Sequence, residues 1–235
     1  MTNGGFVGRQ RILAAVLLMA SAIPVVAGCG KAEFNYIANA YEKTYFRVPS
    51  AWSEVDGAPV DDVLLSGLLQ AKPDSEVARR AKGLMWSAAY DASEDPTAEH
   101  VFSAFPTTEP VVYSMVFHLP QVIQGALSFD ILRDFIFPVT TSSRVRAEQN
   151  GQGLSGFELL NDQVLTPSDG VRGIRVVYNY ELGLDTIHTF DLTAYVNNDS
   201  STVYLLLIRC TARCYRERAV ELDGIATSFT VRSQV

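Results

Sequence analysis

The sequence predicts an α+β fold, in which helices pack on the faces of an antiparallel β-sheet. Three observations lead to this prediction. Strand-like runs of β-branched and aromatic residues occur in the first third of the chain, and three more follow one another in the last third. Between them lie segments whose apolar residues recur at helical spacing. Helices and strands that are grouped in this way, rather than strictly alternating, are typical of antiparallel sheets.

The N-terminal segment has the features of a secretory signal peptide. Residues 1–28 contain two arginines and no acidic residue, and an apolar run leads into a Val-Ala-Gly-Cys tetrapeptide at residues 26–29. A basic start, a short apolar stretch and small residues before a cleavage site define such a signal. The apolar run is short and is interrupted by Ser21 and Pro24, which argues against a transmembrane helix.

The cysteine that directly follows Ala27 and Gly28 matches a bacterial lipobox. In that motif the signal peptidase cleaves between Gly28 and Cys29, and Cys29 receives a diacylglyceryl group. Acyl chains such as palmitate anchor a protein stably, because each buried methylene contributes ~0.8 kcal/mol. We therefore expect a lipoprotein at the extracytoplasmic face of the cell membrane. An ordinary signal peptide with an incidental cysteine is the alternative.

The predicted mature chain is acidic. Loss of the two signal-peptide arginines leaves 17 basic against 26 acidic residues, a formal net charge of −9. This charge repels nucleic acid and anionic membranes, so we expect no nucleic-acid partner and an attachment that depends on the lipid. We assign residues 1–28 to the signal peptide, 29–43 to the lipidated N-terminus and a polar tether, and 44–235 to a single domain.

The first half of this domain mixes strands and helices. Residues 45–48 form an aromatic and β-branched strand, and a turn at Pro49 folds Trp52 back over the core. Ser128 is placed to cap the N-terminus of a later helix. In chain order the expected elements are helices at 60–70 and 74–82, a strand at 83–91, a long proline-containing loop at 92–110, a strand at 111–118, a helix at 129–137 and a polar loop at 140–156.

The last third is rich in strands. We expect strands at 173–182, 186–196 and 202–210, and a turn-rich loop at 197–201 makes the latter two an antiparallel hairpin. A single amphipathic helix follows Cys214, because the apolar residues from there to Phe229 recur at helical spacing.

Two cysteines remain once Cys29 is assigned. Cys210 and Cys214 are four residues apart in an exported chain, so we expect a disulfide between them. Two separate buried thiols, or metal or redox chemistry, are the alternatives. A structural zinc site needs four ligands, and the chain has only three histidines, so we expect no metal.

Two short motifs resemble the PsbP-like fold, an α/β/α sandwich. One is the strand that runs into Pro49-x-x-Trp52. The other is the strand at 204–208 that leads into a helix and then into the Ser-Phe and short apolar tail of residues 225–231. Actinobacterial lipoproteins of the LpqN type are similar in layout, including the lipobox. The resemblance covers the two ends, and residues 60–156 match only in the order of elements. It implies an accessory role without a shared catalytic set.

Among the residues that suggest catalysis or cofactor binding, none forms a specific signature. Residues 151–156 match Gly-x-Gly-x-x-Gly, but a dinucleotide site needs that loop between a strand and a helix, whereas a polar stretch precedes it here. A flexible loop is the simpler interpretation, and we expect no cofactor. The histidines are His100, His118 and His188. Because His188 alternates with Phe190 and Leu192, we expect it in the core rather than as a general base.

A Ser-His-Asp triad with Asp185 or Asp191 is disfavoured, because no Gly-x-Ser-x-Gly elbow marks a nucleophile. We therefore expect no catalytic residues. Two charged clusters are also expected to be ordinary. The first, Asp91, Glu94, Asp95 and Glu99, lacks the pattern of an EF-hand and is interpreted as a solvated acidic loop, with weak calcium binding as the alternative.

The second charged cluster is basic and consists of Arg209, Arg213, Arg216 and Arg218. It is either a docking patch for carboxylate or phosphate groups or, since Glu217 and Glu221 are interleaved, an exposed helix with internal ion pairs. We favour the ion-paired helix.

We expect a non-enzymatic binding or accessory module with an envelope protein as its partner. A carrier of a lipid or another apolar ligand is the first alternative, and a hydrolase of cell-envelope material is the second. A deep apolar cavity would favour the carrier, and a cleft converging on His118 or His188 would favour the hydrolase. A packed interior with an exposed apolar patch would favour the binding module.

Overall fold

The computed structural model describes residues 32–102, 108–121, 124–125, 127–167, 170–183 and 185–232. The chain divides into two units, residues 1–31 and 32–235, and all described residues belong to the second. The predicted cleavage and lipidation sites at Gly28 and Cys29 therefore lie outside the described residues. In the described part of the chain, no helix is long and apolar enough to cross a lipid bilayer.

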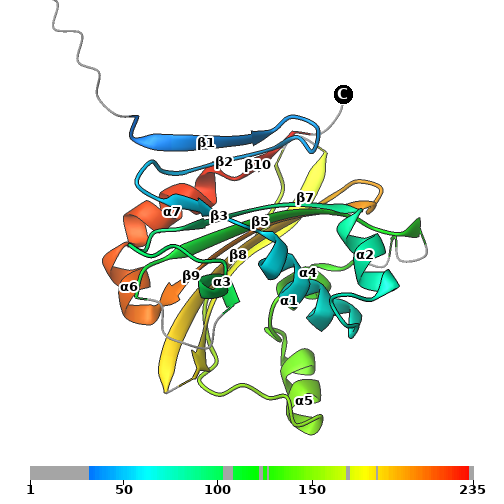
Figure 1. The fold of residues 1–235 in the computed structure, drawn as a ribbon. Helices are drawn as coiled ribbons and strands as arrows, with labels where there is room; N and C mark the ends of the chain where they lie inside the picture. The colour runs from blue at the N-terminus through cyan, green and yellow to red at the C-terminus, as the bar shows by residue number, and fades with distance from the viewer. Residues whose placement is uncertain are drawn as a thin grey trace, which may run out of the picture. The chain divides into compact units, whose positions relative to one another are not determined.

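Two antiparallel sheets organise the domain (Figure 1). The small sheet has the order β1 (Phe34–Asn39), β2 (Thr44–Pro49) and β10 (Thr230–Val231). The large sheet has the order β3 (Ser53–Val55), β4 (Met85–Asp91), β5 (Val111–His118), β9 (Thr202–Thr211), β8 (Thr186–Asn197), β7 (Val171–Leu182) and β6 (Glu158–Leu165).

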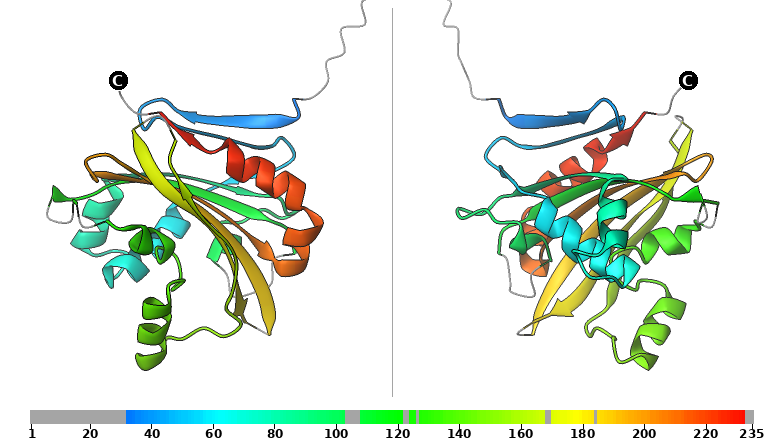
Figure 2. Two further views of the ribbon diagram at one scale, coloured as in Figure 1. Left: turned by 180° about the vertical axis from the view of Figure 1, so that it is seen from behind. Right: turned by 45° about the vertical axis from the view of Figure 1, so that its right-hand side comes forward.

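Seven helices are described: α1 (Ala58–Leu69), α2 (Glu76–Lys82), α3 (Glu99–Phe102), α4 (Phe129–Arg133), α5 (Thr141–Gln149), α6 (Ala212–Glu217) and α7 (Ala219–Ser228). Figures 1 and 2 show α6, α7 and the small sheet on one side of the large sheet and the other helices on the opposite side. The predicted α+β architecture, an antiparallel sheet with helices on its faces, is confirmed.

Two hydrophobic cores follow from this layering. On one face of the large sheet, Leu65 of α1 and Leu132 of α4 pack with Tyr113 of β5. On the other face, Phe46 of β2 and Ile225 of α7 pack with strand residues. Because helices or strands cover both faces, the inner strand β5 is buried at every position except its last. Such strands appear in the sequence as continuous apolar runs rather than alternating ones.

Side-chain caps explain where several helices begin. Ser128 Oγ accepts a hydrogen bond from Ile131 N at 3.2 Å, which confirms the predicted cap of α4. That helix ends at Arg133 rather than at residue 137. The reason is Asp134, whose carboxylate accepts hydrogen bonds from the backbone amides of Val139 and Thr140 at 2.7 and 2.8 Å. These bonds draw the chain into a loop one turn early.

Four sequence predictions need correction. The expected tether at 29–43 is wrong for residues 34–39, which form β1 and pair with β2 along its whole length. The expected polar loop at 140–156 contains α5, and the strand β6 after it was not predicted. The expected loop at 92–110 contains the short helix α3. The expected single C-terminal helix is two helices, α6 and α7, separated at Arg218.

The elements that escaped prediction share a physical feature. Helix α5 buries no residue, so its sequence has no apolar face to reveal it. Strand β6 lies at the edge of the large sheet and is exposed at most positions, so it lacks the apolar run of the inner strands. A regular spacing of apolar residues arises where one face of a helix or strand is buried. Helices and strands that bury few residues therefore cannot be recognised from this spacing.

Candidate functional site

A polar cavity of about 450 Å³ surrounds His118 at one end of the large sheet. Five segments that are distant in the sequence meet there: the β1–β2 turn, the end of β5, the start of β7, the β8–β9 hairpin and the end of the described chain. The lining residues are Tyr41, Glu42, Lys43, His118, Gly170, Val171, Asn197, Asn198, Asp199, Thr202, Tyr204 and Arg232. We call this cavity the His118 pocket.

Hydrogen bonds hold His118 in place on both sides. Its Nε2 lies 2.9 Å from Glu42 Oε2, and its Nδ1 lies 3.2 Å from Thr202 Oγ1. The Glu42 side chain is 10% exposed and that of His118 is 44% exposed, so the carboxylate is the inner partner and the imidazole borders the open pocket. Glu42 and Thr202 were not singled out from the sequence, because only the β1–β2 and β8–β9 turns bring them to the end of β5.

The β8–β9 hairpin that forms one wall is rigidly closed. Asn197 Oδ1 accepts hydrogen bonds from the backbone amides of Ser201 and Thr202 at 2.9 and 3.0 Å. Asn197 Nδ2 donates to Ser201 Oγ at 2.9 Å. Ser200 adopts a positive φ of 57°, which the tight turn requires. The predicted hairpin at 197–201 is thus confirmed, and the pocket wall is fixed before any ligand arrives.

The order carboxylate, imidazole, hydroxyl in this pocket is that of a nucleophilic triad. By the criterion set from the sequence, a cleft at His118 favours a hydrolase. Acyl transfer also needs free amide donors for the oxyanion near the nucleophile. However, two amides next to the Thr202 hydroxyl, its own and that of Ser201, already donate to Asn197. The arrangement is therefore better suited to holding a polar ligand than to attacking one.

His100 lies in a second polar cluster, with Asp91. The His100 Nδ1 is 2.6 Å from Asp91 Oδ2, and the Ser93 hydroxyl contacts the same nitrogen at 3.5 Å. In a triad the acid and the hydroxyl occupy different ring nitrogens, so this cluster is not a relay. Burial alone raises the pKa of Asp91, but hydrogen bonds from the Ser93 amide, His100 and the Thr97 amide outweigh it and lower that pKa.

The prediction of a solvated acidic loop is wrong for Asp91, which is 1% exposed. Its carboxylate accepts hydrogen bonds from the backbone amides of Ser93 and Thr97 at 2.9 and 3.0 Å and so fixes the start of the loop. The other three acids of that cluster, Glu94, Asp95 and Glu99, are exposed, as expected. Among the described residues, no group of three or more His, Cys, Asp or Glu side chains is placed to hold a metal ion.

His188 is buried in the core, as predicted. It is 0% exposed, and its Nδ1 lies 3.5 Å from a guanidinium nitrogen of Arg209, which is itself 0% exposed. Burial, with the Arg209 charge as a second cause, lowers the pKa of His188 to about 4. Burial also lowers the pKa of Arg209 to about 10. No triad forms with Asp191, because odd and even residues of a strand point to opposite faces of the sheet.

Asp191 has a structural role instead. It is 1% exposed and accepts two hydrogen bonds from the Arg175 guanidinium at 2.9 and 2.7 Å and one from Tyr215 Oη at 2.7 Å. Arg175 also donates to Asp223 of α7 at 2.7 Å. This network ties α6 and α7 to β7 and β8. Asp185 lies in an exposed turn with a φ of 56° and approaches no catalytic partner in the described structure.

The glycine-rich loop at 151–156 does not match a dinucleotide site. It runs from α5 into β6, so a helix precedes it and a strand follows, the reverse of the required order. Two of its glycines allow a left-handed backbone conformation: Gly151 and Gly156 both have a φ of 69°. A Cβ at Gly156 would also lie 2.8 Å from Glu181 Cβ.

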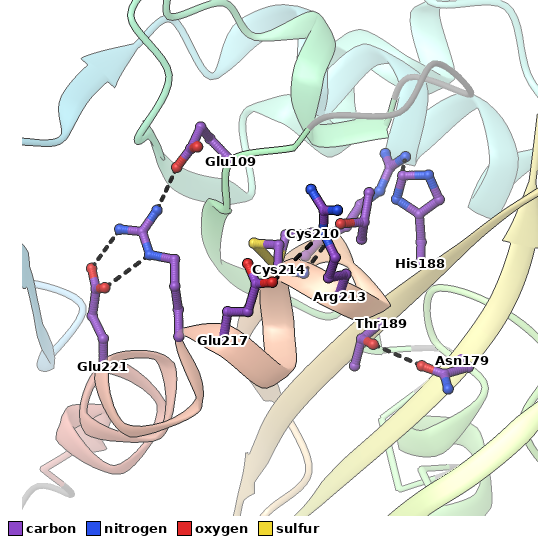
Figure 3. Close-up of a disulfide and its surroundings, with 12 residues drawn as sticks. Glu109, Asn179, His188, Thr189, Cys210, Arg213, Cys214, Glu217 and Glu221 are labelled. Carbon is purple, nitrogen blue, oxygen red and sulfur yellow. Dashed lines mark hydrogen bonds and ion pairs between the residues drawn. A yellow bond between two sulfur atoms is a disulfide. The ribbon is translucent and has the colours of Figure 1, made fainter.

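The ion-paired helix that the sequence favoured is confirmed for Arg213 and Arg218. It is wrong for Arg209, which is buried in strand β9 rather than exposed on a helix. Arg218 donates to Glu109 at 2.6 Å and to both carboxylate oxygens of Glu221 at 2.9 and 2.8 Å, and Arg213 lies 3.7 Å from Glu217 (Figure 3). Arg216 instead lines a surface groove of about 700 Å³ between α6–α7 and β1–β2. Val220 of α7 also lines this groove and is 90% exposed.

Cys210 and Cys214 are joined by a disulfide, in agreement with the prediction (Figure 3). Cys210 ends the buried part of β9, and Cys214 lies in the first turn of α6. Both are nearly inaccessible, at 0% and 5% exposure. The bond therefore fixes the angle at which α6 leaves the sheet, and it is shielded from reductants in the folded state.

No family model and no curated protein matches this sequence. Among solved structures, it is similar to cyanobacterial PsbP (CyanoP) from Synechocystis sp. PCC 6803, with a TM-score of 0.50 and 14% identity over 87% of this chain and 95% of that chain. LpqN, involved in cell envelope biogenesis of Mycobacterium tuberculosis, matches with a TM-score of 0.44 and 13% identity over 85% and 90% of the two chains.

The Saccharomyces cerevisiae Ran-binding protein Mog1p matches with a TM-score of 0.42 and 11% identity over 85% of this chain and 96% of that chain. The CyanoP match extends over nearly the whole of both chains, including the middle that the sequence motifs did not cover. The predicted PsbP-like fold is therefore confirmed.

Proposed function

We propose that this protein is a lipid-anchored, extracytoplasmic binding module, which holds a polar segment of an envelope protein in the His118 pocket without turning it over. The lipid anchor at Cys29 rests on the lipobox. The single observation that supports binding is the pocket itself, in which five distant segments converge on an imidazole held by Glu42 and Thr202.

The groups around the pocket suit a polar, mixed-charge ligand. Lys43 supplies a cationic donor, and Asp199 and the Asn198 amide supply acceptors. The wall residues Tyr41 and Tyr204 add flat surfaces, and Tyr41 is 86% exposed. Recognition by a few polar groups placed on a rigid hairpin is typical of binding sites that are formed before the ligand arrives.

Two observations favour this function over the alternatives. The space between the large sheet and helices α1–α4 is filled by the buried side chains of the first core, which leaves little room for a carrier's apolar ligand. The amides beside Thr202 are occupied by Asn197, which disfavours acyl transfer.

Site-specific photo-crosslinking in intact cells of the native host tests the proposal. A photoreactive amino acid replaces Asn198, an exposed residue at the pocket, or Val145, an exposed residue of α5 that serves as the control. We expect one discrete crosslinked protein from position 198 and not from position 145. His118→Ala should abolish it, because both hydrogen bonds that shape the pocket are lost.

Two outcomes would contradict the proposal. Equal crosslinking from both positions, or crosslinking that survives His118→Ala, would exclude the His118 pocket as the binding site. A native mass spectrum of the detergent-extracted protein tests the rest: the mass of residues 29–235 plus acyl chains is expected. A non-covalently retained lipid would instead support the carrier, and an unacylated mass would rule out the anchor.

A further inference from the structure

The small sheet presents one face to the large sheet and the other to solvent. Phe46 and Val48 of β2 point inward, since they are 3% and 0% exposed. The alternate residues of β2 therefore point outward, and their partners on β1 share that face. Figure 1 shows this sheet lying over the large sheet, with β1 at its edge. The outer face is defined as Phe34, Tyr36, Ala38, Tyr45, Arg47 and Arg232.

The outer face combines aromatic rings with arginines. Its six residues include no acid, and three glutamates, Glu33, Glu217 and Glu221, line the groove that Phe34 and Arg47 also line. The Arg47 guanidinium carbon lies 4.3 Å from the centroid of the Phe34 ring, and that of Arg232 lies 5.0 Å from the centroid of Tyr45. Tyr36 is 74% exposed. Tyrosine and arginine pair an apolar body with a polar tip, and both are favoured where a membrane meets water.

Arg47 and Arg232 both retain guanidinium N–H donors that no carboxylate of the described residues accepts from. Among the described residues, neither arginine forms an ion pair with a carboxylate. Arg47 Nε is buried, so a phosphate can contact only the terminal nitrogens of that guanidinium. The nearest acidic residue of the β1–β2 turn, Glu42, is directed into the pocket, where it contacts His118 at 2.9 Å. A planar guanidinium with free N–H groups is suited to binding phosphate.

The position of this face along the chain restricts what it can meet. Phe34 is five residues after Cys29, and five residues span at most about 18 Å in any conformation. If Cys29 carries the lipid, β1 is held within that distance of the bilayer surface. Helices α2 and α5, on the opposite side of the large sheet, have no such restriction.

We infer that the outer face is a membrane-contact surface, which rests on the headgroups of an anionic phospholipid bilayer with Arg47 and Arg232 on lipid phosphates. The inference rests on the proposed lipid anchor. The net charge of −9 does not prevent this contact, because charges more than about 8 Å away are largely screened at physiological salt. The acidic residues on the opposite side of the large sheet therefore count less than two arginines at the surface.

Depth-dependent fluorescence quenching on the full-length lipoprotein, reconstituted into vesicles, tests this surface. A thiol-reactive fluorophore is attached at Ala38→Cys on the outer face or at Val145→Cys on α5, since Cys210 and Cys214 are buried and paired. The vesicles contain phosphatidylglycerol and a lipid with a nitroxide near the headgroup. We expect quenching at position 38 and none at position 145.

Charge reversal then tests the arginines. Arg47→Glu/Arg232→Glu is compared with Arg79→Glu/Arg146→Glu, which changes the net charge equally at exposed residues of α2 and α5. A basic residue near an anionic surface shifts the equilibrium roughly five-fold, so two shift it about thirty-fold. The first variant should lose most of the quenching at position 38 in phosphatidylglycerol vesicles, and the second should keep it.

The outcomes separate this surface from the anchor. Protein that does not float with the vesicles would rule out the anchor and this inference together. Protein that floats, but is quenched equally at positions 38 and 145, would rule out the surface and leave the anchor standing. Quenching at position 38 that survives Arg47→Glu/Arg232→Glu, or is as strong in pure phosphatidylcholine, would overturn the assignment to anionic lipid.

Discussion

Acidification should destabilise this protein through one buried histidine. His188 is 0% exposed, and burial together with the charge of Arg209 lowers its pKa from 6.5 to about 4. In the unfolded chain the pKa returns to the ordinary value. As the pH falls below 6.5, the unfolded state takes up a proton that the folded state refuses until about pH 4, so stability falls with pH across this window.

The magnitude follows from the two pKa values. At pH 7.5 the imidazole is neutral in both states and contributes nothing. At pH 5 it is almost fully protonated only in the unfolded state, and the free energy of unfolding is lower by about 2 kcal/mol. The full penalty, reached below pH 4, is about 3 kcal/mol. It would be a substantial part of a typical domain stability of about 5–15 kcal/mol.

Urea unfolding at pH 7.5 and 5.0 measures this penalty, with the free energies extrapolated to zero denaturant. The comparison protein is His188→Gln, in which a neutral amide oxygen can still accept from Arg209. The wild type should lose about 2 kcal/mol more than the variant between the two pH values. Circular dichroism at pH 7.5 confirms that the variant is folded. If the two proteins lose the same amount, His188 is not the group responsible and the argument from burial is wrong.

Four further predictions concern stability. Replacing Cys210 and Cys214 together by serine should lower the free energy of unfolding by roughly 2 kcal/mol in urea titrations, because the disulfide closes only a short loop; no loss would contradict this. Tyr215→Phe removes a hydrogen bond to a buried carboxylate and should cost about 1.5–3 kcal/mol in the same assay. Gly173→Ala should prevent folding, because its Cβ would lie 2.1 Å from the carbonyl oxygen of Ala194 in the next strand. Gly224→Ala in α7 places a Cβ that meets nothing within 4 Å. It should stabilise the protein by roughly 1 kcal/mol, measured as a rise in melting temperature.

The sequence was most informative where burial was greatest. The strands around Val112, Leu192 and Leu206 are covered on both faces, so their apolar runs identified them. Trp52 was correctly placed over the core, where it is 5% exposed. Strand β6 and helix α5 were missed because they bury little, and β1 was mistaken for a tether because its exposed tyrosine and asparagines resemble a linker.

The candidate site was only partly visible in the sequence. His118 was one of three histidines considered, but nothing in its neighbourhood distinguished it from His100. Its partners Glu42 and Thr202 are 76 and 84 residues away, and no local pattern links them. Asp91, interpreted as part of a solvated loop, proved to be buried because backbone amides that follow it in the chain return to its carboxylate.

By itself, the sequence determined the acidic charge and indicated the fold class, which depend on composition and local order. It also predicted the lipobox and favoured a disulfide between Cys210 and Cys214. Only the tertiary structure decided which polar groups meet in the His118 pocket and which side chains form the outer face of the small sheet. The physical reason is that burial leaves a periodic trace along the chain. A pocket made from turns depends on how the strands are ordered in space, and that order brings together residues with no sequence relation.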